Sequence, residues 1–374
     1  MRNPHILAHH ERVADIGEKN SKKLLAQTGS NTGNLLFISA VRRIAKYRDY
    51  SSGYKFDPAR IAEMHDGIVI PAANWVQASK DYGWLANLIE KSKLPCVLVG
   101  LGAQSLHADR IPKLTPGTLR FLQVVSERST SISVRGEFTA TVLEKFGVRN
   151  VRVTGCPSLM WWVNRPVSVQ KVAKRISDVV MHSTRSDEAK SQSSNSRYRT
   201  SLYITQYAYK KKLDYVAQTE LSDIVISRNN DLSGVAWDMI HMAYAEKDSD
   251  KVSAHIKKHI KCFFSVDEWV AFMTTKDFSF GTRLHGTIAA LLAGKPAMLV
   301  THDTRTREMA RWAAIPCIDE SEVLRKTEID FQGIYDDLDF SEFNERQKSY
   351  YSEFCEFFDE NEIDHNLCRS VTAS

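Results

Sequence analysis

The sequence alternates short apolar runs with amphipathic segments, and this alternation constrains the fold more than any other feature. In the first half, apolar runs at 66–72, 95–104 and 131–135 are separated by segments with helical periodicity, and another such pair follows as far as residue 158. Continuous apolar strands that alternate with helices are typical of a parallel sheet covered on both faces. The sequence therefore predicts an α/β fold.

The alternation breaks in the middle of the chain and then returns. Residues 183–201 are polar and rich in serine, which is typical of an exposed loop near a domain boundary. Two segments after this loop, SLYITQYAY and SDIVISR, look less regular, and the alternation resumes from Lys257. We expect an N-terminal domain at 1–170, a C-terminal domain at 171–335, and a long amphipathic helix within 336–374 that packs back toward the N-terminal domain. Two such parallel-sheet domains leave a cleft between them.

Composition excludes several classes of protein. A formal charge of +5 on 374 residues, with acidic and basic residues mixed, is too weak to indicate nucleic-acid binding. No apolar run approaches the roughly 20 residues of a membrane span, and residues 1–30 lack a signal-peptide core, so we expect a cytoplasmic protein. The six cysteines have no CxxC spacing and are interpreted as reduced thiols, mostly in the core.

Motifs for metals and nucleotides are weak or absent. His5, His9 and His10 lack a carboxylate or cysteine at ligand spacing, and the chain has no HExxH, GxSxG or P-loop, so we expect no metal. GLGAQS at 100–105 lacks the third glycine of a dinucleotide motif and is better interpreted as a turn. Trp161 and Trp162 are interpreted as packing residues rather than the wall of a ligand site.

The strongest local signal is basic. Arg283 and His285 lie where the aromatic strand DFSFGT gives way to a long apolar helix, and Arg135 has the same position between SISVR and the helix that follows. Arg305 follows the next strand. Free N–H groups and the positive end of the dipole make a helix start suited to an anion, and guanidinium groups bind carboxylate or phosphate in a bidentate manner. Convergence of these residues on the cleft would form an anion site.

Three blocks of the sequence resemble the polysaccharide pyruvyl transferase family. The first block, at 133–161, begins SVRGEFT and resembles the family's SVRD block. The second, at 280–309, begins FGTRLHGT and resembles its G-R-H block. SNTGNLLF at 30–37 is similar to its N-terminal glycine–asparagine loop. The resemblance implies a GT-B-like fold of two Rossmann-type domains and transfer of a pyruvyl group from phosphoenolpyruvate to a sugar hydroxyl.

The resemblance also implies roles for individual residues. Arg135 and Arg283 are expected to hold the donor's carboxylate and phosphate, with Arg305 at the place of the family's usual lysine, and His285 is the candidate for proton transfer. Further expected contacts are Thr282 and Gly286 with the donor, and Asn31, Asn34 and Asn74 with the acceptor. No metal or cofactor is implied. The chain departs from the family pattern at Gly136, where an aspartate is common, and at 66–75, which lacks the usual paired glycines.

The residue types agree with this chemistry, because phosphoenolpyruvate carries two anionic groups and histidine titrates near neutral pH. Two alternatives remain open. One is a glycosyltransferase of the same architecture that uses a nucleotide sugar, and the other is a non-catalytic glycan-binding protein. The sequence leaves open the acceptor sugar, its attachment to a lipid, peripheral association with the inner face of a membrane, and the oligomeric state.

Overall fold

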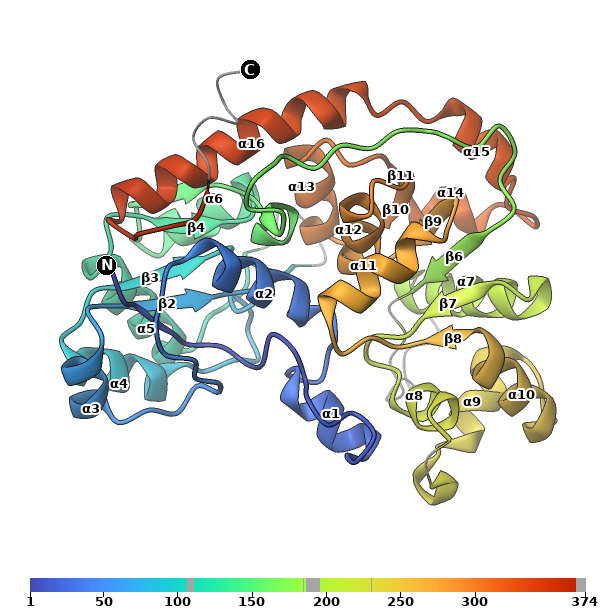
Figure 1. The fold of residues 1–374 in the computed structure, drawn as a ribbon, viewed down its shortest axis with the longest axis horizontal. Helices are drawn as coiled ribbons and strands as arrows, with labels where there is room; N and C mark the ends of the chain where they lie inside the picture. Colours follow the sequence, from blue (N-terminus) through green and yellow to red (C-terminus); the bar gives the residue numbers. More distant parts are fainter. Residues whose placement is uncertain (106–110, 184, 186–195, 230, 368–374) are drawn as a thin grey trace.

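The described residues form a three-stranded and a two-stranded parallel sheet in the first half of the chain and a six-stranded parallel sheet in the second half, with helices around them (Figure 1). The computed structural model describes residues 1–105, 111–183, 185, 196–229 and 231–367. The first half contributes the elements β1 (His5–Ile6), α1 (Ser21–Gln27), α2 (Asn34–Ile44), α3 (Pro58–Met64), β2 (Ile68–Pro71), α4 (Gly83–Ser92), β3 (Cys96–Val99), α5 (Pro116–Glu127), β4 (Ile132–Val134), α6 (Glu137–Lys145), β5 (Val151–Val153) and the 3₁₀ turn η1 (Pro157–Met160).

The second half contributes a longer series of elements. These are β6 (Val179–His182), α7 (Ser196–Lys211), β7 (Asp214–Val216), α8 (Leu221–Ser227), η2 (Leu232–Gly234), α9 (Trp237–Tyr244), α10 (Ser249–His259), β8 (Ile260–Lys261), α11 (Val266–Thr274), β9 (Phe278–Gly281), α12 (Leu284–Leu292), β10 (Ala297–Thr301), α13 (Thr304–Trp312), β11 (Cys317–Asp319), α14 (Glu320–Leu324), α15 (Phe331–Asp337) and α16 (Ser341–Glu360).

The strands of the first half follow one another in space in the order of the chain. β1, β2 and β3 pair in parallel, β4 pairs in parallel with β5, and a parallel bridge between Leu101 and Val134 joins the two groups. Every residue of β2 and β3 is buried, because helices cover both faces of this sheet. The apolar runs 66–72 and 95–104, which are predicted to be strands, therefore form the centre of the sheet in the first half.

The sheet of the second half has its strands in the order β8-β7-β6-β9-β10-β11, all parallel. Numbered from β6 as the first strand, this order is 3-2-1-4-5-6, the order of the Rossmann fold. The order reverses between β6 and β9, and ligands of such sheets bind beyond the carboxyl ends of the strands at this reversal. The predicted α/β class with parallel sheets in both halves is confirmed, and the second sheet has the predicted Rossmann order, whereas the strands of the first half follow the order of the chain.

One hydrophobic core connects the two halves. Helix α2 is almost entirely buried, and its apolar residues belong to the same cluster as those of β6, β9 and α12 in the second half. The helix begins at Asn34, directly after Gly33, so the glycine–asparagine loop that precedes it is held between the two sheets. This position explains why a loop from the N-terminal part of the chain can reach the start of α12.

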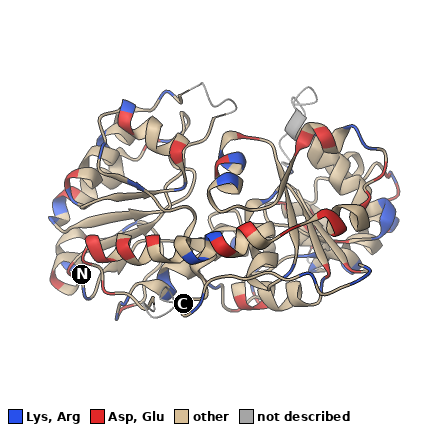
Figure 2. Ribbon diagram, turned by 90° about the horizontal axis from the view of Figure 1, so that it is seen from above, with Lys and Arg blue, Asp and Glu red and all other residues tan. Residues whose placement is uncertain are grey.

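Helix α16 runs along both halves and carries acidic and basic residues together (Figure 2). Its C-terminal end contacts the first sheet, where Arg152 Nη1 lies 2.7 Å from Glu360 Oε2 and Asn361 Oδ1 accepts from the backbone N–H of Thr130 at 3.1 Å. Nearer its middle, the Tyr350 hydroxyl donates to the carbonyl of Cys156 at 3.1 Å. The helix thus contacts the first half through several polar side chains.

The structure differs from the prediction in the region after residue 183. Of the predicted polar loop 183–201, positions 184 and 186–195 lie outside the described residues, and 196–201 begin helix α7 rather than continue a loop. The two less regular segments are the helices α7 and α8. The serine-rich composition led to the prediction of a loop where α7 begins, because serine, asparagine and threonine have weak helix propensity. The domain boundaries stay a prediction.

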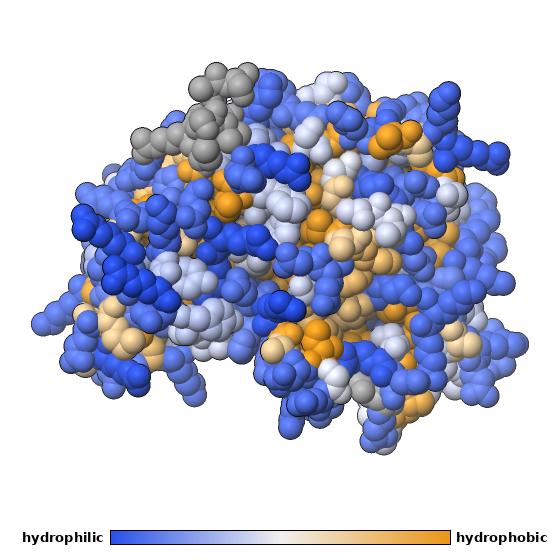
Figure 3. All heavy atoms as spheres, viewed as in Figure 1, coloured by the Kyte–Doolittle hydropathy of each residue, from blue (hydrophilic) through white to orange (hydrophobic). Residues whose placement is uncertain are grey.

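The surface is mostly polar. On the face seen in Figure 3, hydrophilic side chains cover most of the molecule, and hydrophobic ones gather toward the middle, where the two halves meet. Among the helices of the described residues, none is both long enough and apolar enough to cross a membrane.

Candidate active site

The reversal point of the second sheet carries Arg283 and His285. Strand β9 ends at Gly281, Arg283 is the N-cap of α12, and His285 lies in the first turn of that helix. The backbone N–H of Arg283 donates to Nδ1 of His182, the last residue of β6, at 3.2 Å. The two strands that flank the reversal therefore position this helix start together, as the sequence predicts for a strand-to-helix junction.

The Arg283 side chain turns back into its own half of the molecule. Its Nε donates to the carbonyl of Ser183 at 2.9 Å, and its Nη2 donates to the carboxylate of Glu220 at 2.9 Å and to the hydroxyl of Thr219. Glu220 is fully buried, and the positive charges of Arg283 and Arg185 oppose the effect of burial, so that the net shift lowers the Glu220 pKa. Arg283 thus already has a carboxylate partner.

His285 faces the N-terminal loop across the boundary between the halves. A Cβ atom built on Gly33 would lie 3.0 Å from His285 Nδ1 and 3.0 Å from the amide oxygen of Asn31. The imidazole lies 5.8 Å from the ring of Phe37 on α2, and its Nε2 is 3.9 Å from Sγ of Cys156. The histidine is therefore enclosed by residues of both halves.

Arg135 reaches the same place from the first sheet. The side chain follows β4, is 1% exposed, and donates from Nε to the carbonyl of Gly100 at 2.8 Å and from Nη2 to the carbonyl of Ala72 at 3.3 Å. Its guanidinium carbon lies 5.6 Å from the centre of the Phe37 ring. Among the described residues, no carboxylate forms an ion pair with Arg135. A buried guanidinium without a counter-ion is costly, and an anionic ligand would offset that cost.

Three arginines affect the pKa of the His285 imidazole. Burial lowers the pKa of His285 well below its ordinary value, and the positive charges of Arg135, Arg305 and Arg283 lower it further. Arg305, in the first turn of α13, forms an ion pair with Asp303 at 3.3 Å, and its buried Nε has no hydrogen-bond partner among the described residues. The imidazole is therefore neutral at neutral pH in the ligand-free protein.

The other residues expected at the donor site lie close to the sheet. Thr282 is buried, and its backbone N–H donates to the carbonyl of His182 at 3.0 Å. A Cβ atom built on Gly286 would lie 2.6 Å from Cγ of His182, so any larger residue would collide with that ring. In this structure Gly286 allows the close approach of α12 to β6, and its predicted contact with the donor stays a prediction.

The three asparagines expected at the acceptor side line a single hollow beside this cluster. Asn31, Asn34 and Asn74 share its wall with Phe37, and its volume is about 390 Å³. A Cβ atom built on Gly102 would lie 3.1 Å from the amide oxygen of Asn74 and 3.3 Å from Cδ of Arg135. Asn74, in the wall of the hollow, therefore lies close to the Arg135 side chain.

The family model of the polysaccharide pyruvyl transferases matches residues 18–304, which is well over half of the sequence. The chain belongs to the polysaccharide pyruvyl transferase family. The matched region contains Asn31, Asn34, Asn74, Arg135, Thr282, Arg283, His285 and Gly286, whereas Arg305 lies one residue beyond its end. The resemblance noted from the sequence is confirmed at the level of the family.

Solved structures similar to this chain have low sequence identity to it. A functionally uncharacterised protein from Klebsiella pneumoniae is 9% identical, with a TM-score of 0.39, and the match covers 84% of this chain and 89% of that chain. An S. aureus MnaA–UDP co-structure is 10% identical, with a TM-score of 0.42 and coverages of 100% and 94%. A UDP-N-acetylglucosamine 2-epimerase is 9% identical, with a TM-score of 0.45 and coverages of 96% for both chains. No curated protein sequence matches the chain.

The family's aspartate is replaced by Gly136, and the structure fills the space beside this glycine with Glu308 from the other half. A Cβ atom built on Gly136 would overlap Cγ of Glu308. The Glu308 carboxylate accepts from the backbone N–H of Thr139 at 2.9 Å and from the Thr139 hydroxyl at 3.2 Å, at the start of α6. Sequence reasoning missed Glu308, since nothing in one sequence connects a residue of α13 with Gly136.

Glu308 should make stability depend on pH. Burial raises the pKa of Glu308 to about 7, although hydrogen bonds from Thr139 and the charge of Arg135 oppose the shift. Because the folded protein then holds this proton more tightly than the unfolded chain, the stabilising effect is complete below pH 4.5 and is lost as the pH rises to about 7. In the wild type, we expect the free energy of unfolding to decline by up to about 3 kcal/mol across this interval because of Glu308. Glu308→Gln should remove this decline.

The measurement is urea unfolding followed by tryptophan fluorescence at a series of pH values. Since other ionisable groups also contribute to the pH dependence of stability, the informative quantity is the difference between the wild type and Glu308→Gln. Glu345→Gln, an exposed glutamate on α16, is the matched control and should leave the pH dependence unchanged. Equal slopes for the wild type and Glu308→Gln would contradict the assignment.

Gln218 is a second residue that the sequence did not reveal. It is buried, its side-chain oxygen would lie 2.6 Å from a Cβ atom on Gly33, and its Nε2 has no hydrogen-bond partner among the described residues. It follows β7, a three-residue strand whose brevity conceals it in the sequence. Recognition of that strand would have placed Gln218 at the same edge of the sheet as Arg283.

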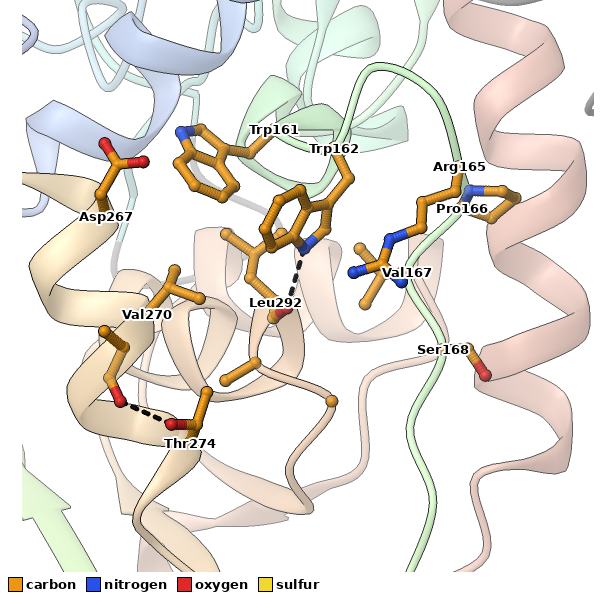
Figure 4. A pocket seen from close by; sticks show the side chains of 13 residues that line it. Trp161, Trp162, Arg165, Pro166, Val167, Ser168, Asp267, Val270, Thr274 and Leu292 are labelled. Atoms are coloured by element: carbon orange, nitrogen blue, oxygen red, sulfur yellow. Dashed lines mark hydrogen bonds between the residues drawn. The ribbon is translucent and has the colours of Figure 1, made fainter.

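A larger cavity lies elsewhere and contains none of the predicted site residues. Its volume is about 560 Å³, and Trp161 and Trp162 line it (Figure 4). Trp162 Nε1 donates to the carbonyl of Leu292 at 2.8 Å, and the Arg43 guanidinium lies 4.0 Å from the Trp161 ring, so the pair connects η1 with α12 and α2. Both tryptophans pack against neighbouring elements and also line this cavity, so the packing role that the sequence favours stays a prediction.

Clusters of candidate metal ligands are absent from the part of the chain that the structure describes. No group of three or more histidine, cysteine, aspartate or glutamate residues there could hold a metal ion, and His5 belongs to strand β1. Cys96, Cys156, Cys262 and Cys317 are free thiols, of which the first two are buried, and Cys368 lies outside the described residues.

Proposed function

We propose that the chain transfers the pyruvyl group of phosphoenolpyruvate to hydroxyls of a cell-surface polysaccharide or its lipid-linked precursor, and that the product is a pyruvate ketal. One observation carries the proposal: the buried Arg135 of the first sheet and His285, two residues after the N-cap Arg283 of α12, lie against the same Phe37 ring at the reversal point of the Rossmann sheet. A donor with a carboxylate and a phosphate matches this arrangement of cations.

Arg135 is the main donor-binding group in this proposal. It is buried and lacks an ion pair among the described residues, whereas Arg283 is held by Glu220 and Arg305 by Asp303. We assign Arg135 to one anionic group of the donor and Arg305 to the other. Arg283 supports the site through its charge and through the N-cap of α12. No metal or cofactor takes part.

His285 carries the proton. In the free protein the arginines keep it neutral, and the negative charges of the bound donor offset theirs, so the His285 pKa rises toward neutral pH. A proton delivered to C3 of phosphoenolpyruvate makes C2 electrophilic. One sugar hydroxyl then bonds to C2 and loses its proton to His285, which restores the protonated imidazole.

A second hydroxyl completes the ketal. The bond from C2 to the phosphate oxygen breaks, phosphate leaves with the electron pair, and the second hydroxyl bonds to C2. The proton of this hydroxyl leaves with the phosphate. The two hydroxyl protons therefore end on the new methyl group and on phosphate, so the reaction needs no oxidant or reductant.

The test is incubation with phosphoenolpyruvate and glycan acceptors, with phosphate release measured together with the mass of the product. We expect phosphate release that depends on the acceptor, and a mass increase of the acceptor that corresponds to a pyruvate ketal. Turnover of a nucleotide sugar in place of phosphoenolpyruvate would support a glycosyltransferase instead. Glycan binding without turnover of either donor would support a non-catalytic glycan-binding protein.

In this proposal, the cellular compartment of the protein is the one that contains its donor substrate. Because phosphoenolpyruvate is a cytoplasmic metabolite, we place the protein in the cytoplasm, at the inner face of the membrane when the acceptor is lipid-linked. Fractionation of cells that express the chain would test this, and recovery outside the cytoplasmic and membrane fractions would contradict it.

A further inference from the structure

The hollow beside the arginine–histidine cluster has walls of aromatic rings and amides. We propose that it is the acceptor subsite, in which a neutral sugar ring stacks on Trp84 while its hydroxyls bind asparagine side chains. This inference rests on the proposed function, for which it names the binding site of the acceptor. The hollow is lined by His9, Gly29, Asn31, Asn34, Phe37, Tyr54, Ala73, Asn74, Trp75, Lys80, Tyr82, Trp84 and Leu85.

Packed rings form the rigid part of this wall. Trp75 stacks on Tyr82, with ring centres 4.8 Å apart and planes inclined by 18°, and Tyr54 meets Trp75 edge-on at 5.5 Å. Burial raises the pKa of Tyr82 to about 12, so its phenol stays neutral. These rings are engaged with one another and hold the shape of the pocket before any ligand arrives.

Trp84 differs from the rings behind it. It lies in the first turn of α4, is 45% exposed, and has no ring contact among the described residues. An exposed indole that lines a pocket has an apolar face and a polar N–H, so it can contact a ligand while one end stays in water. The apolar face of a pyranose ring is a suitable partner, because it covers the indole while its hydroxyls stay available for hydrogen bonds.

The amides supply these hydrogen bonds. The side-chain oxygen of Asn74 is buried and has no hydrogen-bond partner among the described residues. An unsatisfied buried acceptor is unfavourable, and a hydrogen bond from the hydroxyl of a bound sugar would offset this cost. Asn31 and Asn34 are already fixed in place, since Asn31 Oδ1 accepts from the N–H of Gly33 at 2.9 Å and Asn34 Nδ2 donates to the carbonyl of Thr28 at 2.9 Å.

The hollow opens onto the reacting groups. Phe37 lines it and also lies 5.8 Å from His285 and 5.6 Å from the Arg135 guanidinium. Asn74 lies beside the Arg135 side chain at Gly102. A sugar on Trp84 can therefore direct hydroxyls past Phe37 toward His285. The larger cavity at Trp161 and Trp162 shares no lining residue with this route.

The experiment measures sugar binding without the donor. Methyl glycosides of glucose, galactose, mannose and N-acetylglucosamine are titrated against the full chain, with saturation-transfer NMR as the readout. The variants are Trp84→Ala, which removes an exposed ring, and Asn74→Ala. The matched control is Trp162→Ala, in the other cavity. Phosphoenolpyruvate binding by calorimetry is measured for every variant.

We expect at least one glycoside to bind the wild type and Trp84→Ala to weaken that binding about tenfold, as loss of an aromatic contact implies. Asn74→Ala should weaken the same glycoside, and Trp162→Ala should not. Phosphoenolpyruvate affinity should be unchanged in Trp84→Ala and Trp162→Ala. Failure of every glycoside to bind the wild type, or equal loss in Trp162→Ala, would overturn the inference.

The two proposals can fail separately. If Trp84-dependent sugar binding is found but phosphoenolpyruvate is not consumed, the pocket stands and the pyruvyl transfer is wrong. If pyruvyl transfer occurs and its KM for the acceptor is the same in Trp84→Ala as in the wild type, the transfer stands and the pocket is wrong.

Discussion

His285→Ala should lower kcat for pyruvyl transfer by about 10²–10⁴-fold, the usual contribution of a general acid or base. Phosphoenolpyruvate affinity should change much less, because the cationic groups of the site remain. Removal of the imidazole should not unfold the protein, since the hydrogen bond of its side chain within the described part of the chain is a long one to the thiol of Cys156, at 3.9 Å. The measurement is steady-state kinetics together with calorimetric binding of phosphoenolpyruvate.

A control separates loss of this imidazole from loss of any histidine. His241 on α9 is partly buried and hydrogen-bonded to Ser249 at 2.9 Å, away from the residues of the site, so His241→Ala should retain wild-type kcat. In addition, NMR titration of His285 should show its pKa rising when phosphoenolpyruvate binds. A kcat for His285→Ala close to that of the wild type would refute the assignment of this residue.

Arg135→Met should lower phosphoenolpyruvate affinity by about 10²-fold, which corresponds to the loss of about 3 kcal/mol from a charged hydrogen-bonding partner. Methionine fills similar space and removes a buried charge, so thermal stability should change little even though two backbone carbonyls lose a donor. Arg135→Lys should give an intermediate affinity, since lysine keeps the charge but lacks the planar fork. Calorimetry and thermal unfolding measure the two effects.

Arg43→Met is the matched control for this experiment. Arg43 lies over Trp161 and pairs with Asp267 at 3.1 Å, outside the cluster around His285, so its loss should leave phosphoenolpyruvate binding unchanged. An unchanged affinity in Arg135→Met would refute the donor site. Arg283→Ala is less informative, because it would leave the buried Glu220 without its closest cation and would destabilise the protein through that carboxylate.

Local chemistry made part of the site predictable. Arg283 and His285 were located because an aromatic strand, a turn and an apolar helix follow one another within a few residues, and this order alone fixes a strand-to-helix junction. Arg135 was located for the same reason. By contrast, Gln218 was hidden by the brevity of β7, and Glu308 was hidden because its partner Gly136 belongs to the other half of the molecule.

Periodicity by itself determined the α/β class and the parallel strands, because strands buried on both faces must be apolar throughout and the helices between them must be apolar on one side. Only the tertiary structure decided the partners of each side chain. It directs Arg283 to Glu220, leaves Arg135 buried without an ion pair among the described residues, and encloses His285 between the two halves. These contacts depend on how the two sheets pack, and packing joins residues far apart in the chain through geometry that no short motif contains.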